Sequence, residues 1–332
     1  MTDWGFRIAT DPSFGGGHVA RAVALAGGMA AGSGDQVVFF TDPANECPAA
    51  VSAAGIRCRA EAAPEAIVEI CEAGRRGDIG AIICDSYAVP ETAVGKLAGE
   101  LPVAVFRDGG RRGPEHTSID IHPGAEGLPG VIAGPEFAPL DPAFGRANAI
   151  CARGAAIDET KQPRVLIAFG LRDSSGMAGN ALEALLEYRP ALSLTVATSA
   201  QSPTFDRLAA LAARSPAVRL VADAPDMVPL YAGADIAVGA PGGSQFERAC
   251  CGLPTVLLAQ SERQRPLVAA WAASAAARHA QRPEDLPAQI AGLLENKDVV
   301  SQMSRRASGL VDGRGALRLA AALRERVGAL AA

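Results

Sequence analysis

The chain has 332 residues, of which 49% are hydrophobic and 20% are charged, and its formal net charge is −5. This size allows a large core and is typical of two domains. Lysine and arginine are scattered and aromatic residues make up only 5%, which argues against a nucleic-acid surface or a base-stacking platform. No apolar run is as long as a membrane span and no secretory leader opens the chain, so we expect a cytoplasmic protein without nucleic-acid or membrane partners.

The seven cysteines are odd in number and contain no Cys-x-x-Cys pair. We therefore expect reduced thiols rather than disulfides. His116 and His122 lie near Asp120, but no further ligand set accompanies them. We expect neither a metal site nor a cofactor.

Short apolar runs alternate with helical patterns, which is typical of parallel, doubly wound α/β sheets. The predicted strands are Phe6–Ala9, Val37–Thr41, Ile79–Cys84, Val103–Phe106, Ile119–Ile121, Val165–Phe169, Leu192–Ala197, Val218–Val221, Ile236–Val238 and Thr255–Leu258. We predict two Rossmann-like domains, 1–150 and 151–315, and a last helix, 316–332, that packs across both. Ligands of such sheets bind at the carboxyl ends of the strands, so a cleft between the halves is the expected site.

The most informative stretch spans residues 239–254 and reads GAPGGSQFERACCGLP. It follows a buried strand with a glycine-rich turn and then a helix. The glycines let the backbone approach a ligand, and the first N–H groups of a helix suit an anion. Glu247, one turn into that helix, would repel phosphate but can accept hydrogen bonds from ribose hydroxyls. The stretch is therefore either a seat for a nucleoside diphosphate or a plain strand-loop-helix unit with a solvated acid.

A second glycine loop, Gly15 to Gly17, follows the first strand and opens the first helix. Ala20 stands where a dinucleotide-binding loop needs its third glycine, so we do not expect NAD. His18 comes next, and the positive end of a helix favours an uncharged imidazole, which can take a proton from water or a hydroxyl. The alternative is a hydrogen-bonded histidine without a chemical role.

Polar residues follow other predicted strands. Asp85, Tyr87 and the pair Arg107-Asp108 come at strand ends in the first half. Gly170 to Asp173 and Gln264 come after strands in the second half. These side chains could orient a sugar or a water molecule, or could simply cap helices and form turns.

In this order, the pieces resemble the UDP-sugar hydrolases of pseudaminic acid biosynthesis and, more loosely, the GT-B glycosyltransferases. The resemblance covers nearly the whole chain. The matching pieces are Arg7, Gly15-x-Gly17-His18-x-x-Arg21, Asp85-Ser86-Tyr87, a worn linker from Gly134 to Phe144, Phe169-Gly170 with Asp173, Gly242-Gly243-Ser244-x-x-Glu247-Arg248, Gly252-Leu253-Pro254, Gln264 and Asp312-Gly313-x-Gly315.

The resemblance implies a GT-B fold, UDP held by the second half, and His18 at the anomeric carbon with Tyr87 helping to place the water or the sugar. Family members hydrolyse UDP-2,4-diacetamido-2,4,6-trideoxy-β-L-altropyranose to UDP and a free sugar without a required metal, on the way to pseudaminic acid and flagellin glycosylation. The substrate-binding residues implied by the matching pieces are Arg7, Gly15, Gly17, Arg21, Asp85, Gly170, Asp173, Gly242, Gly243, Ser244, Glu247 and Gln264.

The chain departs from the family pattern mainly on the sugar side. The departures are Ala9, Asp141, Leu171, Arg172 and Arg263. They leave the exact sugar, the stereochemical outcome and the oligomeric state open. They also keep two alternatives to a hydrolase: a GT-B glycosyltransferase that uses a UDP-sugar donor, and a nucleotide-sugar-binding protein without catalytic activity.

Overall fold

A computed structural model describes residues 3–10, 16–42, 47–63, 65–108, 116–125, 130–151, 162–187 and 192–330. The chain divides into two compact units. The first unit comprises Met1–Pro142 with Gly313–Ala332, and the second unit comprises Ala143–Asp312. The division predicted from the sequence falls near residues 150 and 315.

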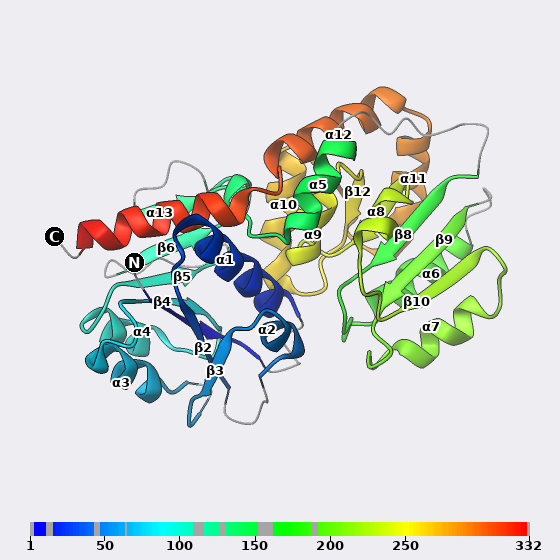
Figure 1. Ribbon diagram of the computed structural model, residues 1–332. Helices are drawn as coiled ribbons and strands as arrows, with labels where there is room; N and C mark the ends of the chain where they lie inside the picture. Colours follow the sequence, from blue (N-terminus) through cyan, green and yellow to red (C-terminus); the bar gives the residue numbers. More distant parts are fainter. Residues whose placement is uncertain are drawn as a thin grey trace. The chain divides into compact units, whose positions relative to one another are not determined.

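In the described part of the first unit, seven parallel strands form one sheet in the order β3-β2-β1-β4-β5-β6-β7 (Figure 1). The strands are β1 Trp4–Ile8, β2 Val37–Thr41, β3 Arg57–Ala60, β4 Ala81–Asp85, β5 Val103–Phe106, β6 Thr117–Asp120 and β7 Val131–Ala133. The helices are α1 Gly17–Ser33, α2 Ala49–Ala53, α3 Val68–Arg76, α4 Glu91–Ala98 and α13 Gly315–Leu330, with a 3₁₀ turn, η2, at Pro135–Phe137. The central strands β1 and β4 are buried along their whole length, as helices on both faces of a parallel sheet require.

In the described part of the second unit, six parallel strands are ordered β10-β9-β8-β11-β12-β13. They are β8 Arg164–Ala168, β9 Ser193–Thr198, β10 Val218–Ala222, β11 Ile236–Gly239, β12 Thr255–Leu257 and β13 Arg278–His279. The helices are α5 Pro142–Cys151, α6 Met177–Leu186, α7 Phe205–Ala212, α8 Val228–Ala232, α9 Gly243–Cys250, α10 Arg265–Ala273, α11 Leu286–Leu294 and α12 Lys297–Leu310, with 3₁₀ turns η3 Glu262–Gln264 and η4 Pro283–Asp285. The predicted α/β class with two doubly wound sheets is confirmed.

Each sheet reverses its strand order at one point, between β1 and β4 in the first unit and between β8 and β11 in the second. In open parallel sheets, ligands bind outside the carboxyl ends of the strands at this reversal. Helix α1, which carries His18, is the next element after β1, and Asp85 ends β4. Gly170 follows β8, and the glycine-rich turn at Gly242 follows β11. The topology therefore brings the sequence-predicted residues to the reversal point of each sheet.

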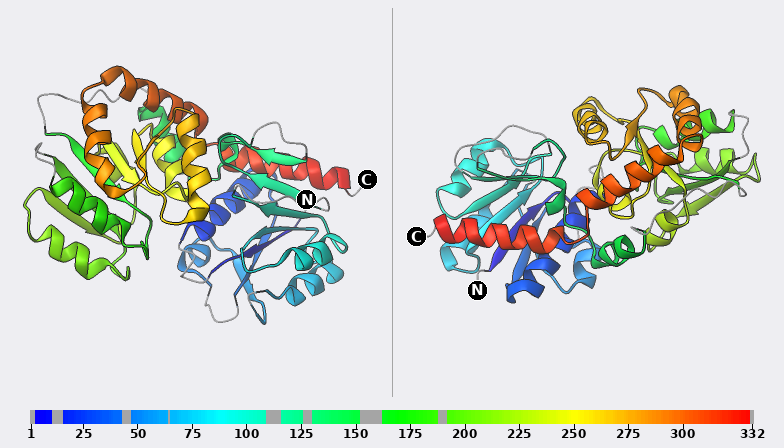
Figure 2. Two further views of the ribbon diagram at one scale, coloured as in Figure 1. Left: turned by 180° about the vertical axis from the view of Figure 1, so that it is seen from behind. Right: turned by 90° about the horizontal axis from the view of Figure 1, so that it is seen from above.

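Helix α13 lies beside α1 within the first unit, although the two come from opposite ends of the chain (Figures 1 and 2). Two glycines allow this approach. A Cβ on Gly28 would lie 2.8 Å from the backbone carbonyl of Ala316, and a Cβ on Gly315 would lie 2.1 Å from the carbonyl oxygen of Ala138. Gly315 belongs to the Asp-Gly-x-Gly piece of the sequence, which thus has a packing role.

We expect Gly28→Ala to lower the free energy of unfolding by about 1–3 kcal/mol, because the added methyl group must push α13 away from α1. Gly27→Ala is the matched control, since a Cβ there meets no atom within 4 Å. In the control, the better helix propensity of alanine is expected to leave stability unchanged or to raise it by up to about 1 kcal/mol. Urea denaturation of both variants measures the difference, and equal effects would contradict the packing argument.

The structure corrects the expectation for two cysteines. Cys47 and Cys58 form a disulfide between the loop after β2 and strand β3, whereas the odd count and the spacing suggest only free thiols. Cys71, Cys84, Cys250 and Cys251 are buried and belong to no disulfide. Burial raises the pKa of the Cys84 thiol to about 12, so it stays protonated.

Across the described residues, none of the helices combines the length and the apolar character needed to cross a membrane.

Candidate active site

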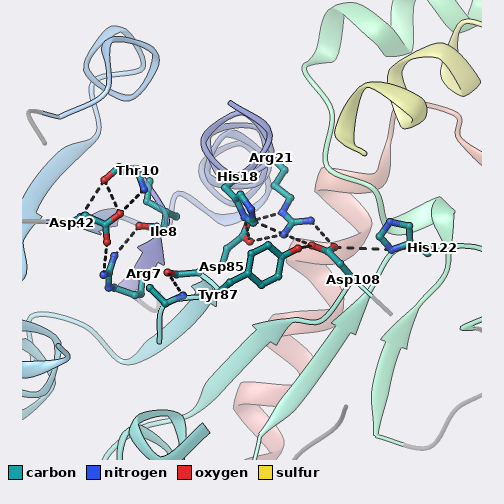
Figure 3. A network of polar contacts seen from close by, with 12 residues as sticks. Arg7, Ile8, Thr10, His18, Arg21, Asp42, Asp85, Tyr87, Asp108 and His122 are labelled. Carbon is teal, nitrogen blue, oxygen red and sulfur yellow. Dashed lines mark hydrogen bonds and ion pairs between the residues drawn. The ribbon is translucent and has the colours of Figure 1, made fainter. Parts of the chain in front are cut away.

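The start of helix α1 carries two residues that face the reversal point of the first sheet. His18 is the second residue of α1 and Arg21 lies one turn further, so both side chains project from the same end of the helix (Figure 3). Gly17, the first residue of α1, is exposed, and a Cβ there would meet no atom within 4 Å. A ligand could therefore come close to the backbone at this point. Gly15 lies outside the described residues.

His18 forms a buried pair with Asp85. The Nδ1 atom of His18 lies 2.5 Å from Oδ1 of Asp85, and both residues are buried. Burial acts to raise the pKa of Asp85, but the charge of Arg21 outweighs it, and the pKa of this carboxyl is below its usual value. An ionised carboxylate can only accept a hydrogen bond, so Nδ1 of His18 is the donor in this pair and Nε2 is the nitrogen left to act as a base. This is the arrangement of an oriented general base.

Arg21 joins two carboxylates from neighbouring strands. Its Nε and Nη2 atoms donate to the two oxygens of Asp85 at 2.5 Å each, and its Nη1 donates to Oδ1 of Asp108 at 2.8 Å. The guanidinium also lies 4.3 Å above the ring of Phe106. Burial acts to lower the pKa of Arg21, but Asp108 and Asp85 raise it well above its usual value. Arg21 therefore holds the Asp85 carboxylate in position, and Asp85 in turn orients the imidazole of His18.

Tyr87 completes this cluster as a hydrogen-bond donor. Its hydroxyl donates to Asp108, while the ring is half exposed and stands edge-on to the ring of His18 at 5.1 Å (Figure 3). Burial of the hydroxyl end and the charge of Asp108 raise the pKa of Tyr87 well above its usual value. The phenol thus stays protonated and can orient a ligand but is a poor base. On the other side of Asp108, Nδ1 of the buried His122 lies 3.1 Å from Oδ1 of Asp120.

Arg7 occupies a different place from the rest of the cluster. It is fully buried, and its Nη2 pairs with Oδ1 of Asp42 at 2.7 Å. The other oxygen of Asp42 accepts from the backbone N–H of Thr10 at 2.9 Å. Arg7 therefore links the end of β1 to the residue that follows β2, and its side chain is buried.

In the second unit, the glycine-rich turn leaves the start of α9 open. Gly243 is exposed and Gly242 and Ser244 are partly exposed, and no described side chain caps this helix start. The first N–H groups of a helix lack partners inside the helix and suit an anion. Only glycine fits at position 239 before this turn, because a Cβ on Gly239 would lie 2.3 Å from the carbonyl oxygen of Ala168.

A buried arginine lies beneath this turn. Arg248 is fully buried, and its Nη2 donates to the carbonyl oxygen of Ala240 at 2.7 Å while its Nε donates to Oε1 of Gln245 at 3.2 Å. Burial lowers the pKa of Arg248, though not enough to neutralise a guanidinium at neutral pH. Its charge therefore adds to the positive field at the start of α9.

Glu247 points one oxygen at a phenol from the preceding helix. The hydroxyl of Tyr231 donates to Oε2 of Glu247 at 2.6 Å, and burial together with the charge of Glu247 raises the pKa of Tyr231 well above its usual value. A carboxylate offers about four lone-pair positions, so this bond uses only part of its accepting capacity. The sequence contains Tyr231, but nothing in its spacing identifies it as the partner of Glu247.

Two further predicted residues of the second unit, Asp173 and Gln264, are linked through Gln260. Asp173 accepts from the N–H groups of Met177 and Ala178 at the start of α6, and burial raises its pKa. Its Oδ1 also accepts from Gln260 at 2.9 Å, and Gln264 in turn accepts from the backbone N–H of Gln260 at 2.8 Å. Gln260 thus connects two predicted residues and was not singled out from the sequence.

Some neighbouring residues stay open. Gly170 has a positive φ of 89° and a Cβ there would meet no atom within 4 Å, while Leu171, one of the departures from the family pattern, is 53% exposed. Among the described residues, no group of three or more histidine, cysteine or acidic side chains could hold a metal ion.

Neither a protein-family model nor a curated protein sequence matches the chain. Solved structures match over nearly its whole length. MurG of Acinetobacter baumannii aligns with a TM-score of 0.69 and 17% identity, covering 97% of this chain and 99% of MurG. The UDP-GlcNAc 2-epimerase of Neisseria meningitidis, bound to UDP-GlcNAc, aligns with a TM-score of 0.68 and 13% identity over 97% of this chain and 100% of the epimerase.

The third structure is the glycosyltransferase SsfS6 of Streptomyces sp. SF2575, complexed with thymidine diphosphate. It aligns with a TM-score of 0.64 and 14% identity, covering 98% of this chain and 99% of the transferase. The chain has the GT-B fold. The predicted fold is thereby confirmed, and identities this low carry no further than the fold.

Proposed function

We propose that the protein binds a UDP-sugar and hydrolyses it at the anomeric carbon. The observation that carries the proposal is the buried pair of His18 and Asp85, whose 2.5 Å contact orients an imidazole as a base at the reversal point of the first sheet. The fold agrees with this, because structures that share it were solved with UDP-GlcNAc or thymidine diphosphate bound.

In this proposal the second unit binds the UDP moiety. The diphosphate bonds to the N–H groups at the start of α9, near Gly242 to Ser244, with the buried charge of Arg248 behind the turn. Glu247 accepts hydrogen bonds from the ribose hydroxyls while it keeps its bond from Tyr231. The leaving group is thus stabilised by dipoles and a cation that are in place before the reaction starts.

The reaction is a substitution at the anomeric carbon. A water molecule gives one proton to Nε2 of His18 as its oxygen bonds to the carbon, the carbon–oxygen bond to UDP breaks, and UDP leaves with the electron pair. Asp85 stabilises the imidazolium that forms, and Arg21 keeps Asp85 ionised. The O–H of Tyr87 donates to Asp108, and its phenol oxygen accepts a hydrogen bond from the water or the sugar. The products are UDP and the free sugar.

For the sugar, we infer the diacetamido-trideoxy class of the pseudaminic acid pathway, on the strength of the sequence pieces that the chain shares with that hydrolase family. The fold is equally compatible with a transferase that passes the sugar to another hydroxyl. A panel of UDP-sugars, including UDP-2,4-diacetamido-2,4,6-trideoxy-β-L-altropyranose, incubated with the protein in water alone tests the reaction. We expect UDP and free sugar to be released without an acceptor. Turnover only after an acceptor sugar or lipid is added, or tight UDP binding without any turnover, would contradict hydrolysis.

The role of Glu247 can be tested with a ligand that lacks the ribose hydroxyls. Replacing Glu247 alone would leave the hydroxyl of Tyr231 without its acceptor, so Tyr231→Phe, which removes that hydroxyl, is the starting variant and the control. In this background we expect Glu247→Ala to weaken UDP binding about 10- to 100-fold, since hydrogen bonds to a charged group contribute about 1.5–3 kcal/mol. Calorimetry should show no such loss for 2′,3′-dideoxy-UDP. An equal loss for both ligands would contradict ribose recognition.

A further inference from the structure

A cavity in the second unit lies away from the residues proposed to bind UDP. It has a volume of about 630 Å³ and is formed where α10 ends, where β13 begins and along one face of α12. Its lining residues are Ala272, Ala275, Ala277, Arg278, Val299, Gln302, Met303, Arg305 and Arg306. Arg278 is the first residue of β13, so the cavity opens at the amino end of a strand, whereas the proposed UDP seat is at the carboxyl ends.

Three arginines line this cavity and no acidic residue does. Within the described part of the chain, the side chains of Arg278, Arg305 and Arg306 form no ion pair and no hydrogen bond. Other exposed arginines do pair with carboxylates, as Arg75 does with Glu100 and Arg164 does with Asp235. In a chain with 36 acidic and 31 basic residues, three unneutralised guanidinium groups around one cavity form a local site of positive charge.

Apart from Gln302, the rest of the lining is apolar. Val299, Gln302, Met303 and Arg306 follow the spacing of one helix face on α12, so the arginine borders an apolar strip. Ala272 in the last turn of α10, and Ala275 and Ala277 after it, are also apolar. A volume of several hundred cubic ångströms holds a molecule of nucleotide size. The cavity is thus suited to a ligand with one strongly anionic end and one apolar part.

We propose that this cavity binds a soluble phosphorylated small molecule. Its phosphate groups bond to Arg278, Arg305 and Arg306, because a guanidinium matches the geometry of phosphate oxygens with two parallel hydrogen bonds. Its apolar part lies on Val299 and Met303. The site is separate from the proposed active site and does not depend on the reaction assigned to it.

The experiment is a calorimetric titration of the full chain with inorganic pyrophosphate. Pyrophosphate can also bind at the proposed UDP site, so the binding that is lost when the cavity arginines are replaced reports the second site. We expect saturable binding that weakens as salt is raised. In the double variant Arg305→Gln, Arg306→Gln, the dissociation constant is expected to rise at least about 10-fold, which corresponds to 1.4 kcal/mol. Both side chains are exposed, so the fold should be unaffected.

Arg214→Gln is the matched control, since Arg214 is also exposed in the second unit but does not line the cavity. It should bind pyrophosphate like the unmodified chain. A third readout is co-sedimentation with phosphatidylglycerol vesicles. The absence of saturable pyrophosphate binding, equal binding by the double variant, or vesicle capture through these arginines without pyrophosphate binding would each overturn the proposal.

Discussion

Replacement of His18 by alanine is expected to slow UDP release about 100- to 10,000-fold, the range that a positioned general base contributes. The reason is that the imidazole is the group oriented by Asp85 at the proposed reaction centre. UDP affinity should stay unchanged, because the residues proposed to hold UDP belong to the second unit. Steady-state kinetics with calorimetry on the same preparation separates the two effects.

Two further variants make this test specific. Asp85→Asn keeps the shape of the site but no longer stabilises an imidazolium, so it should lower kcat in the same direction. His279→Ala removes an exposed histidine on β13 and should leave both kcat and UDP affinity unchanged. Near-normal turnover of the His18 variant would show that His18 is not the base.

The second large effect is expected on stability. Arg21 is the shared partner of Asp85 and Asp108, and all three side chains are largely buried. Arg21→Met would leave two buried carboxylates without their cation, and breaking a buried pair in this way typically costs about 3–5 kcal/mol. The triple variant Arg21→Met, Asp85→Asn, Asp108→Asn removes all three charges and should recover part of the loss. Urea denaturation measures both.

The same cluster predicts how stability changes with pH. In the folded state, burial alone would raise the pKa of Asp85 and Asp108, but Arg21 lowers both below the usual value. Carboxyls with a lowered folded pKa stabilise the fold fully above the unfolded value, which is about 3.9. That contribution is lost as the pH falls below this value. The triple variant should therefore lose less stability than the unmodified protein as the pH falls below about 4.

Arg76→Met is the control, because Arg76 is exposed and its pairs with Glu72 and Asp78 lie on the surface. Exposed ion pairs contribute little to stability, so no clear change is expected. If Arg21→Met were as stable as this control, the buried cluster would not have the role assigned to it.

The central strands could be predicted from the sequence because a strand buried on both faces needs a continuous apolar run. Val37–Thr41 and Val103–Phe106 were placed to the residue. The edge strands β3 and β13 were missed, since they read Arg-Cys-Arg-Ala and Arg-His and are partly exposed. The disulfide of Cys47 and Cys58 lies at the β3 edge of the first sheet, and it can be inferred only once β3 is known to pair with β2.

For the candidate site, the sequence indicated which residues follow strands but not which strands are neighbours. His18, Asp85 and Tyr87 could be selected because polar residues at strand ends gather at one edge of a parallel sheet. The link from Arg21 to Asp108 depends on β4 pairing with β5, and a spacing of 87 residues carries no such signal. Likewise, Asp173 and Gln264 are linked by hydrogen bonds through Gln260, and no motif in the sequence marks Gln260.

The most direct test of the proposed reaction follows the oxygen atom of the attacking water. UDP-2,4-diacetamido-2,4,6-trideoxy-β-L-altropyranose is incubated with the protein in water labelled with heavy oxygen, and both products are analysed by mass spectrometry. If His18 activates water for attack on the anomeric carbon, the label appears in the free sugar and not in UDP. Label in the phosphate groups of UDP, or no release of UDP from this substrate, would contradict the account.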